Sequence, residues 1–107
     1  IKFCERTIDL RPENITVMNR LAWLYAKKRK KIDKGLALIE KVIKAHPNKA
    51  KYIDTLAELL FAKGDIEEAI KNMNKAISHE PDNSYYKQQL WRFKNTSTEI
   101  FDGDQNY

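Results

Sequence analysis

Cysteine, glycine and proline are scarce in this chain of 107 residues, which contains one, three and three of them respectively. The single cysteine, Cys4, excludes an internal disulfide framework and a cysteine-rich zinc site. A lone thiol fits a reducing compartment without requiring one, so the compartment stays open. No apolar run approaches the roughly 18 residues that indicate a membrane-spanning helix, and no signal-peptide pattern is present. Because the chain opens on Ile1 without an initiator methionine, we expect it to be a fragment of a longer protein.

The residue patterns of catalysis and cofactor binding are also missing. No glycine-rich loop could cradle a phosphate. His46 and His79 each stand near the expected end of a helix, where the helix dipole favours a partly protonated imidazole, and neither has a nearby cysteine to build a zinc site. The stretch Asp102-Gly103-Asp104 has the composition of a calcium loop but lacks its other ligands. The sequence predicts no enzyme, no metal and no cofactor; catalysis would need another part of a longer polypeptide.

The charge of the chain is unevenly distributed. Hydrophobic residues make up 42% and charged residues 33%, as in a soluble globular segment, and the net charge is +5. Ten basic residues lie between Lys27 and Lys51 with only Asp33 and Glu40 as acids, whereas the segment after Ser97 has three acids and no base. A basic region of this kind directs attention to anionic partners.

The three prolines mark an internal repeat. Pro12, Pro47 and Pro81 are spaced 35 and then 34 residues apart. Apolar residues recur at the same offsets: Ile1, Leu36 and Ile70; Cys4, Ile39 and Met73; Ile8, Ile43 and Ile77; Leu21, Leu56 and Leu90. A fixed period in this range predicts a stacked array whose core is buried between neighbouring units. Such arrays present a concave surface to another molecule.

Helical periodicity predicts where the helices lie. Asn14 is a suitable N-cap for a helix over residues 14–28. A helix from Ile32 is expected to end at His46, because the residue before a proline disfavours the α region. Further helices are expected over residues 48–62, from 66 up to the turn at 80–83, and over 84–95.

The turns are marked by glycine and by basic residues. Gly64 can supply a left-handed C-cap, and Asp65 can cap the helix that follows. The extra residue of the longer period is placed in the basic turn between Tyr25 and Leu36, because insertions are tolerated best in turns.

These residues resemble the tetratricopeptide repeat family, whose copies carry large, leucine, small and aromatic residues on a first helix, small and bulky residues on a second, and a closing proline. The first complete copy offers Met18, Leu21, Ala22, Tyr25, Gly35, Ile39 and Pro47. The second offers Ile53, Leu56, Ala57, Leu60, Ala69, Met73 and Pro81. The resemblance implies an all-α fold, a right-handed superhelix of antiparallel helix pairs.

The same resemblance divides the chain. A single domain over 1–95 would hold the second helix of a truncated repeat at 1–12, full repeats at 14–47 and 48–81, and a capping helix at 83–95, with a flexible tail at 96–107. Trp91 replaces the small residue of the earlier copies, so we expect a cap in which Trp91 and Phe93 cover the last apolar seam. The uncovered first helix is expected to meet a second copy of the chain or an upstream repeat.

Members of this family bind extended peptides or helices along the groove lined by the first helices, and the resemblance implies the same here. Helical phase places these residues in the groove: Asn19, Trp23 and Lys27, with Thr16 and Ala26; Lys51, Asp54, Glu58 and Phe61, with Ala62; Tyr85, Gln88 and Arg92. Trp23 lies off the core stripe, and aromatic residues and arginine tend to dominate binding energy; simple packing between first helices is the alternative. The family's lysine–asparagine clamp for acidic C-termini is absent as a set, which disfavours an acidic chaperone tail.

The run Lys27-Lys28-Arg29-Lys30-Lys31 carries the alternative function. It could bind nucleic acid, anionic headgroups or an acidic protein, or act as a nuclear localisation signal. The simpler explanation, which we favour, is a solvated turn between helices, and no aromatic residues are interleaved with the basic ones. We therefore rank nucleic acid below a protein or peptide partner.

Overall fold

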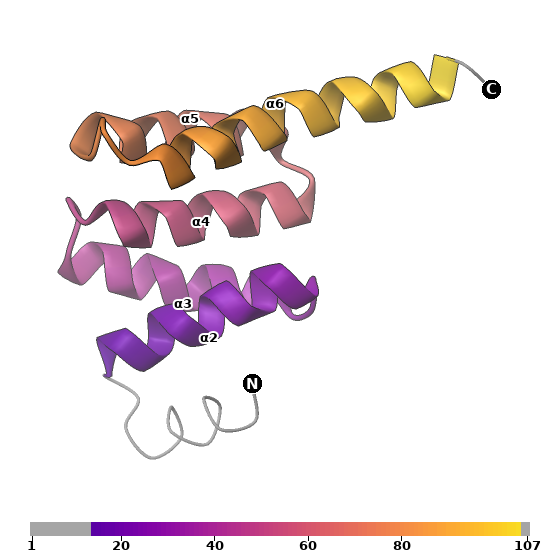
Figure 1. Ribbon diagram of the computed structural model, residues 1–107. Coiled ribbons are helices and arrows are strands. Elements are labelled where there is room, and N and C mark those ends of the chain that lie inside the picture. The colour runs from indigo at the N-terminus through magenta and orange to yellow at the C-terminus, as the bar shows by residue number, and fades with distance from the viewer. Residues whose placement is uncertain (1–13, 106–107) are drawn as a thin grey trace.

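The computed structural model describes the backbone of residues 14–105 and the side chains of residues 14–95. Its helices are α2 (Ile15–Lys28), α3 (Ile32–Ala45), α4 (Ala50–Lys63), α5 (Ile66–His79) and α6 (Ser84–Gln105), and no strand occurs within that range (Figure 1). The predicted helix over residues 1–12, with its proposed self-association edge, lies outside the described residues.

The helices form a stack of antiparallel pairs. Helix α2 packs on α3 and α4 packs on α5, while α4 also contacts both helices of the preceding pair and α6 packs on α5. Figure 1 looks onto α2, α4 and α6, with α3 partly behind α2 and α5 partly behind α6. The stack is elongated, with extents of 50 × 32 × 18 Å. The predicted all-α solenoid is therefore the observed fold.

The sequence signals at the helix ends are largely confirmed. The Asn14 side chain accepts a hydrogen bond from the backbone N–H of Val17 at 3.1 Å, which caps α2. Helix α3 ends at Ala45 with His46 as its C-cap, just before the proline. Gly64 closes α4 with φ 99°, the left-handed conformation that glycine adopts without strain. Asp65 stands at the N-cap of α5, but its side chain makes no capping hydrogen bond.

The extra residue of the first repeat lies in the basic turn, as predicted. Helices α2 and α3 are separated by Arg29, Lys30 and Lys31, whereas only Gly64 and Asp65 separate α4 from α5. Arg29 and Lys31 have φ values of 54° and 51°, and they are the positive-φ residues other than glycine in the described chain. A side chain in this conformation costs about 1 kcal/mol.

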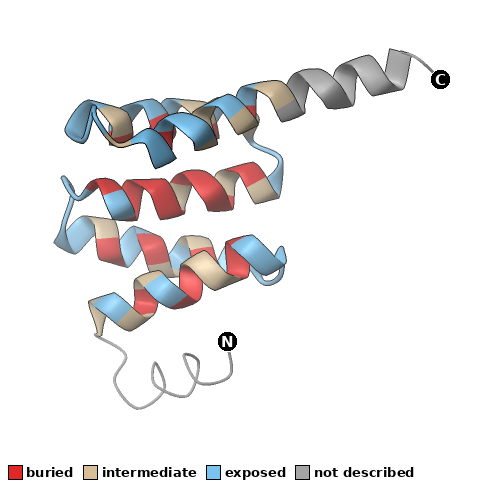
Figure 2. Cartoon of the chain, in the orientation of Figure 1, coloured by how far each residue is buried: buried red, intermediate tan, exposed pale blue. Residues whose placement is uncertain are grey.

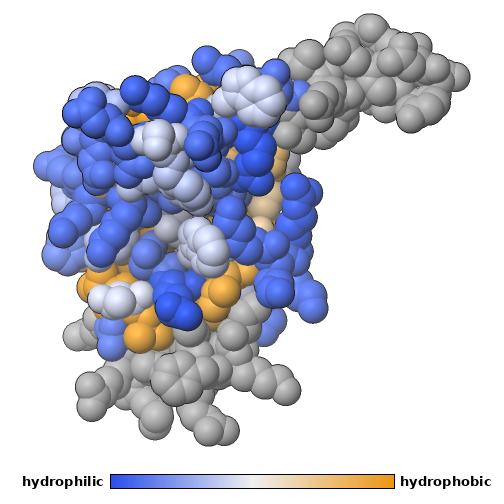
Figure 3. Space-filling view, in the orientation of Figure 1, coloured by the Kyte–Doolittle hydropathy of each residue, from blue (hydrophilic) through white to orange (hydrophobic). Residues whose placement is uncertain are grey.

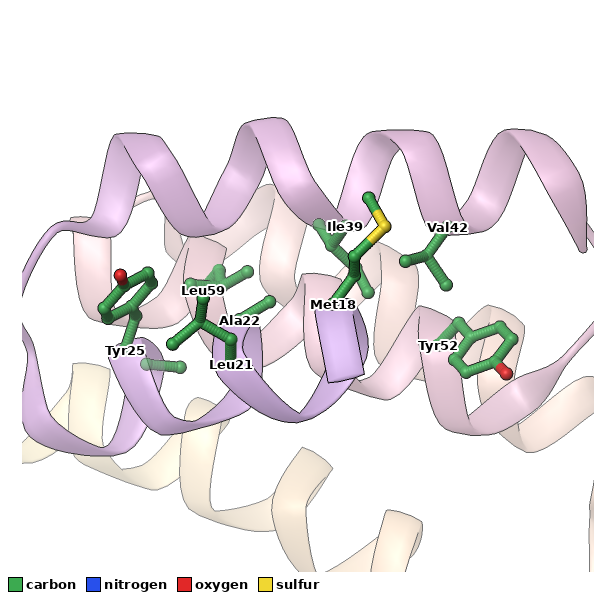
Figure 4. Close-up of a cluster of buried hydrophobic side chains, with 9 residues drawn as sticks. Met18, Leu21, Ala22, Tyr25, Ile39, Val42, Tyr52 and Leu59 are labelled. Carbon is green, nitrogen blue, oxygen red and sulfur yellow. The ribbon is translucent and has the colours of Figure 1, made fainter. Parts of the chain in front are cut away.

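The hydrophobic core consists of two clusters that share α4 (Figure 2). The first lies between α2, α3 and α4, and Figure 4 shows Met18, Tyr25 and Ile39 in it beside Tyr52 and Leu59 of α4. The second lies between α4, α5 and α6, and α4 contributes Ala50, Ile53, Ala57 and Phe61 to it. Burying each large aliphatic side chain stabilises the fold by about 1.5–3 kcal/mol. A single helix thus holds both halves of the stack together.

Gly35 permits the close approach of α3 to α2 and α4. A Cβ atom at this position would stand 2.8 Å from Cδ2 of Leu59 and 3.4 Å from Cβ of Tyr25. Ala22, Ala57 and Ala69, which are small residues of the repeat pattern, are 0% exposed. The small residues of the repeat pattern therefore let helix backbones approach, while larger side chains fill the space around them.

The end of the stack differs from the prediction in two respects. Helix α6 continues to Gln105 instead of ending at Asn95, since no proline interrupts its later residues. Phe93 is 0% exposed and covers the last seam, but Trp91 is 65% exposed. Trp91 takes the position at which Ala22 and Ala57 face the second helix of their own pair. No later helix packs on that face of α6 within residues 14–105, so the indole lies at the surface.

None of the described helices is both long and apolar enough to cross a membrane.

Candidate functional site

One position recurs on the first helix of each repeat, that is, on α2, α4 and α6. Trp23, Glu58 and Arg92 occupy this position in successive copies, at the same spacings of 35 and 34 residues as the prolines. In the first and last helices the side chain is partly exposed, whereas Glu58 on the central helix is buried. On the candidate groove surface, α2 and α6 therefore carry partly exposed side chains at this position, whereas the side chain of α4 is covered.

Glu58 is the centre of an ion cluster made of Lys27, Glu58 and Arg92, which we call the Glu58 cluster. Nη2 of Arg92 donates to both carboxylate oxygens of Glu58 at 2.7 Å. Lys27 Nζ lies 3.6 Å from Oε2 of the same carboxylate, whose side chain is only 4% exposed. Charge-assisted bonds of this length are strong because the carboxylate is shielded from water. The cluster ties α2 and α6 to α4.

Aromatic rings support both cations of the cluster. The Arg92 guanidinium carbon lies 5.0 Å from the centroid of Phe61 and 5.2 Å from that of Phe93. These two rings stack at 4.5 Å with an interplanar angle of 20°. Lys27 Nζ lies 5.3 Å from the Trp23 ring. Phe61, predicted to line the groove, is 7% exposed, so its ring packs beneath Arg92 instead of facing solvent.

Asp54 lies one turn before Glu58 on α4 and is 6% exposed. Its Oδ1 atom accepts no hydrogen bond within the described part of the chain. The pKa of this carboxyl is raised from 3.8 to about 7, first by burial and then by the nearby charge of Glu58, while Lys27 and Arg92 act in the opposite direction. Asp54 is therefore a buried acid that titrates close to neutral pH.

Two other side-chain oxygens on this surface are, like Oδ1 of Asp54, buried without a hydrogen-bond donor among the described residues. Oδ1 of Asn19 on α2 and Oε1 of Gln89 on α6 are buried and accept no hydrogen bond from the residues that the structure describes. Asn19 was among the predicted groove residues. Gln89 was not, because the sequence pattern selected its neighbour Gln88, which is exposed. The helical phase of α6 relative to α4, which depends on packing, decides between the two.

Trp23 and Tyr85 form the aromatic part of the surface. Trp23 is partly buried and lies within hydrogen-bonding reach of the Tyr85 hydroxyl, although the two residues belong to the first and last described helices. Tyr85 is 40% exposed. Its pKa is raised by burial and by the charges of Asp54 and Glu58, which places it beside both carboxylates. Two aromatic residues therefore meet above the acidic face of α4.

The remaining predicted groove residues are less connected to this centre. Lys51 is exposed, and its Nζ lies 5.3 Å from the ring of Tyr52 rather than at the Glu58 cluster. Gln88 is exposed as well. Ala26, also predicted there, is buried. The site thus comprises seven of the predicted groove residues, linked by contacts or by their electrostatic influence on one another: Trp23, Lys27, Asp54, Glu58, Phe61, Tyr85 and Arg92.

Some residues of the basic run contact other side chains, whereas others are simply exposed to solvent. Lys27 belongs to the Glu58 cluster, and Lys31 Nζ lies 5.8 Å from the Tyr25 ring. Lys28, Arg29 and Lys30 between them are exposed. In the space-filling view, hydrophilic surface covers most of the face formed by α4 and α6, and apolar patches lie below it over α2 (Figure 3).

Within the described residues, no three His, Cys, Asp or Glu side chains are grouped so that they could hold a metal ion. The His46 ring instead lies 5.9 Å from the ring of Tyr52, where the first repeat turns into the second.

Stacked antiparallel helix pairs, small residues at the helix crossings and a surface formed by the first helices define a helical-repeat solenoid. The tetratricopeptide repeat model matches residues 28–90, and the chain belongs to the tetratricopeptide repeat family. The repeats of this family are known as protein-interaction modules.

Known proteins agree with this assignment. The chain is 35% identical over 75 residues to the mitochondrial import receptor subunit TOM70 of Rattus norvegicus, and equally to that of Mus musculus. These matches cover 69% of the chain but only 12% of each receptor subunit, so the chain spans about an eighth of its curated relatives.

Solved structures share the fold. MamA from Desulfovibrio magneticus RS-1 superposes with a TM-score of 0.77 at 20% identity over 95% of this chain and 57% of MamA. A mutant O-GlcNAc transferase from Thermobaculum terrenum gives 0.75 at 22% identity over 84% of this chain and 17% of the transferase. At such identities the likeness concerns the fold alone.

Proposed function

We propose that the chain binds an extended segment of a partner protein across α2, α4 and α6, with Trp23 and Tyr85 as the main contacts. One observation carries this proposal: Trp23 and Tyr85, from the first and last of these helices, come within reach of each other beside a charged cluster. Partly exposed aromatic residues next to an arginine are the groups that usually dominate protein binding. The name of the related TOM70, an import receptor subunit, is consistent with a protein partner.

Two buried residues of the site, Glu58 and Phe61, support the surface without touching the partner. Glu58 and Phe61 hold Arg92 in place, and Arg92 keeps a side-chain exposure of 38% through which it can reach a bound segment. A fixed arginine loses less conformational entropy on binding than a free one. The surface is therefore pre-organised.

The two tryptophans provide the test. Trp23→Ala removes an aromatic residue from the proposed site, while Trp91→Ala removes the more exposed ring at the far face of α6. Proteins crosslinked to the wild-type chain in its native cell extract should be lost with Trp23→Ala and retained with Trp91→Ala, with modest dependence on salt. Equal recovery with both variants would show that the partner binds elsewhere.

The second candidate function is binding of an anionic partner through the basic turn, favoured by the consecutive exposure of Lys28, Arg29 and Lys30. Lys27 is left out of its test because it also pairs with Glu58. Replacing the three exposed residues with serine should abolish nucleic-acid or acidic-protein binding, and that binding should weaken steeply with salt. Salt-insensitive binding, or binding unchanged in the triple variant, would rule this function out.

A further inference from the structure

The two cations at the centre of the site, Arg92 and Lys27, are already paired with the carboxylate of Glu58. Arg92 donates twice to Glu58 at 2.7 Å, and Lys27 lies 3.6 Å from the same carboxylate. An acidic side chain from a partner would have to displace a carboxylate that is 4% exposed and held from both sides. The Glu58 cluster therefore offers little free positive charge to a ligand.

The unmet hydrogen-bonding capacity of the site belongs mainly to acceptors. Four buried side-chain atoms in the described chain have no hydrogen-bond partner: the oxygens of Asn19, Asp54 and Gln89, and one donor, Nε of Arg92, whose Nη2 is bonded to Glu58. The three oxygens come from α2, α4 and α6, one from each helix of the proposed binding surface. An amide can turn to present its nitrogen instead, but an ionised carboxylate can only accept. The carboxylate of Asp54 therefore indicates that the described part of the site lacks a hydrogen-bond donor.

We propose that the groove recognises a partner segment with a lysine or arginine side chain, which donates to the carboxylate of Asp54. The inference deepens the proposed function and rests on it. An unpaired buried carboxylate is costly, and a cationic donor removes that cost while forming a charge-assisted hydrogen bond. A neutral or acidic side chain at the same place does not.

The surroundings of Asp54 suit a long basic side chain. Tyr85 lies near Asp54 and within hydrogen-bonding reach of Trp23, and such rings can pack against the methylene groups of a lysine or arginine, or stack with a guanidinium. Tyr85 is 40% exposed, so part of its side chain faces the solvent from which a ligand would approach. The charged and titratable groups that act on Asp54 are Glu58 on its own helix, Lys27 on α2, and Arg92 and Tyr85 on α6. The cations among them are paired with Glu58.

The ionisation of Asp54 gives the recognition a pH dependence. Because burial raises its pKa to about 7, the carboxyl is largely protonated at pH 6 and largely ionised at pH 8. A basic segment should bind more weakly at pH 6, since the protonated acid no longer attracts a cation.

The experiment uses three heptapeptides of serine and alanine with a single central arginine, glutamine or glutamate, titrated into the ¹⁵N-labelled chain. At pH 8 the arginine peptide should bind about tenfold more tightly than the glutamine peptide, as expected for one charge-assisted bond. Its shifts should centre on α2, α4 and α6 and weaken at pH 6. Asp54→Asn should abolish the preference, whereas Asp33→Asn, which removes an exposed carboxylate on α3, should keep it. Amide spectra of both variants establish that they fold.

The outcomes separate this inference from the proposed function. If the three peptides shift the same groove residues with equal affinity, the groove binds peptides but Asp54 does not select a cation. Tighter binding of the glutamate peptide, or an unchanged arginine preference in Asp54→Asn, likewise overturns the inference while leaving groove binding intact. If no peptide shifts any residue of α2, α4 or α6, the inference fails; the proposed function is then judged separately by crosslinking with Trp23→Ala.

Discussion

Glu58 and Arg92 bind each other although they are the same position of two successive repeats. The separation of the pair is 34 residues, which equals the spacing from Pro47 to Pro81, and the donor and acceptor approach to 2.7 Å. Repetition of the backbone brings equivalent positions of neighbouring first helices side by side, and the change from acid to base between the copies turns that proximity into an ion pair. If both copies carried the same charged residue at this position, two like charges would lie side by side.

Removing the cation from this pair should be costly. Arg92→Met keeps most of the side-chain volume but leaves Glu58 buried with only Lys27 beside it. We expect a loss of about 2 kcal/mol of unfolding free energy, at the lower end for a broken buried pair because Arg92 is 38% exposed. Urea denaturation measures the change.

The matched control is Lys63→Met, which breaks the ion pair with Asp33 at 3.3 Å between side chains that are 54% and 88% exposed. Its effect should stay below about 0.5 kcal/mol, as for other exposed pairs. Equal effects of the two substitutions would mean that the burial of Glu58 contributes nothing.

Asp54 should make the chain less stable as pH rises. The folded-state pKa of about 7 lies above the model value of 3.8, so between these pH values the folded chain holds a proton that the unfolded chain has lost. The stabilisation from this group is complete below pH 3.8 and disappears as pH rises through about 7. Asp54→Asn, which cannot ionise, should stabilise the chain by about 1–3 kcal/mol at pH 8 and hardly change it at pH 4. Thermal denaturation at both pH values tests this, and the same gain at each would disprove it.

Glycine should stabilise the basic turn where the backbone is left-handed. Arg29 has φ 54°, and Arg29→Gly relieves that strain at a helix C-cap. We expect a gain of about 1 kcal/mol in chemical denaturation. Lys30→Gly removes the same charge from the neighbouring residue, which lacks a positive φ, and should bring no gain. A comparable gain at both positions would point to charge repulsion as the cause.

A large side chain at Gly35 should separate the first pair of helices from α4. Even a methyl group there would stand 2.8 Å from Cδ2 of Leu59, so Gly35→Leu should cost about 3 kcal/mol or more through overpacking. Ala37→Leu, two residues away on the exposed side of the same helix, should change stability by less than about 0.5 kcal/mol. Circular dichroism during urea unfolding distinguishes them; a tolerated Gly35→Leu would show that the helices can move apart freely.

The fold was predictable because the repeat fixes it redundantly. Pro47, Pro81, Gly64 and the capping signal at Asn14 all agree with the observed helix boundaries. The length of α6 and the exposure of Trp91 were not predicted. A repeat pattern indicates which residues face another helix in a complete repeat, but not how far the last described helix extends or which of its side chains stay exposed.

The candidate site was predictable as a set of residues but not as an arrangement. Helical phase placed Trp23, Glu58 and Arg92 on one surface, and in the structure Glu58 and Arg92 are in contact. The phase alone did not show that Glu58 and Phe61 are buried or that two cations are paired there, because such contacts depend on side-chain reach between helices that are distant in sequence. Gln88 and Gln89 point about 100° apart around α6, and the packing of α6 against the other helices, which the repeat pattern does not contain, determines which of them is buried.

The position of α4 in both hydrophobic clusters has a consequence for how the chain melts. Tyr52 and Leu59 close the first cluster, while Ile53 and Phe61 close the second, so neither pair of helices keeps an intact core if α4 unfolds. Repeat arrays often lose their units one after another from the ends. In this short array the shared middle helix should couple the halves into a single cooperative transition, with equal calorimetric and van 't Hoff enthalpies.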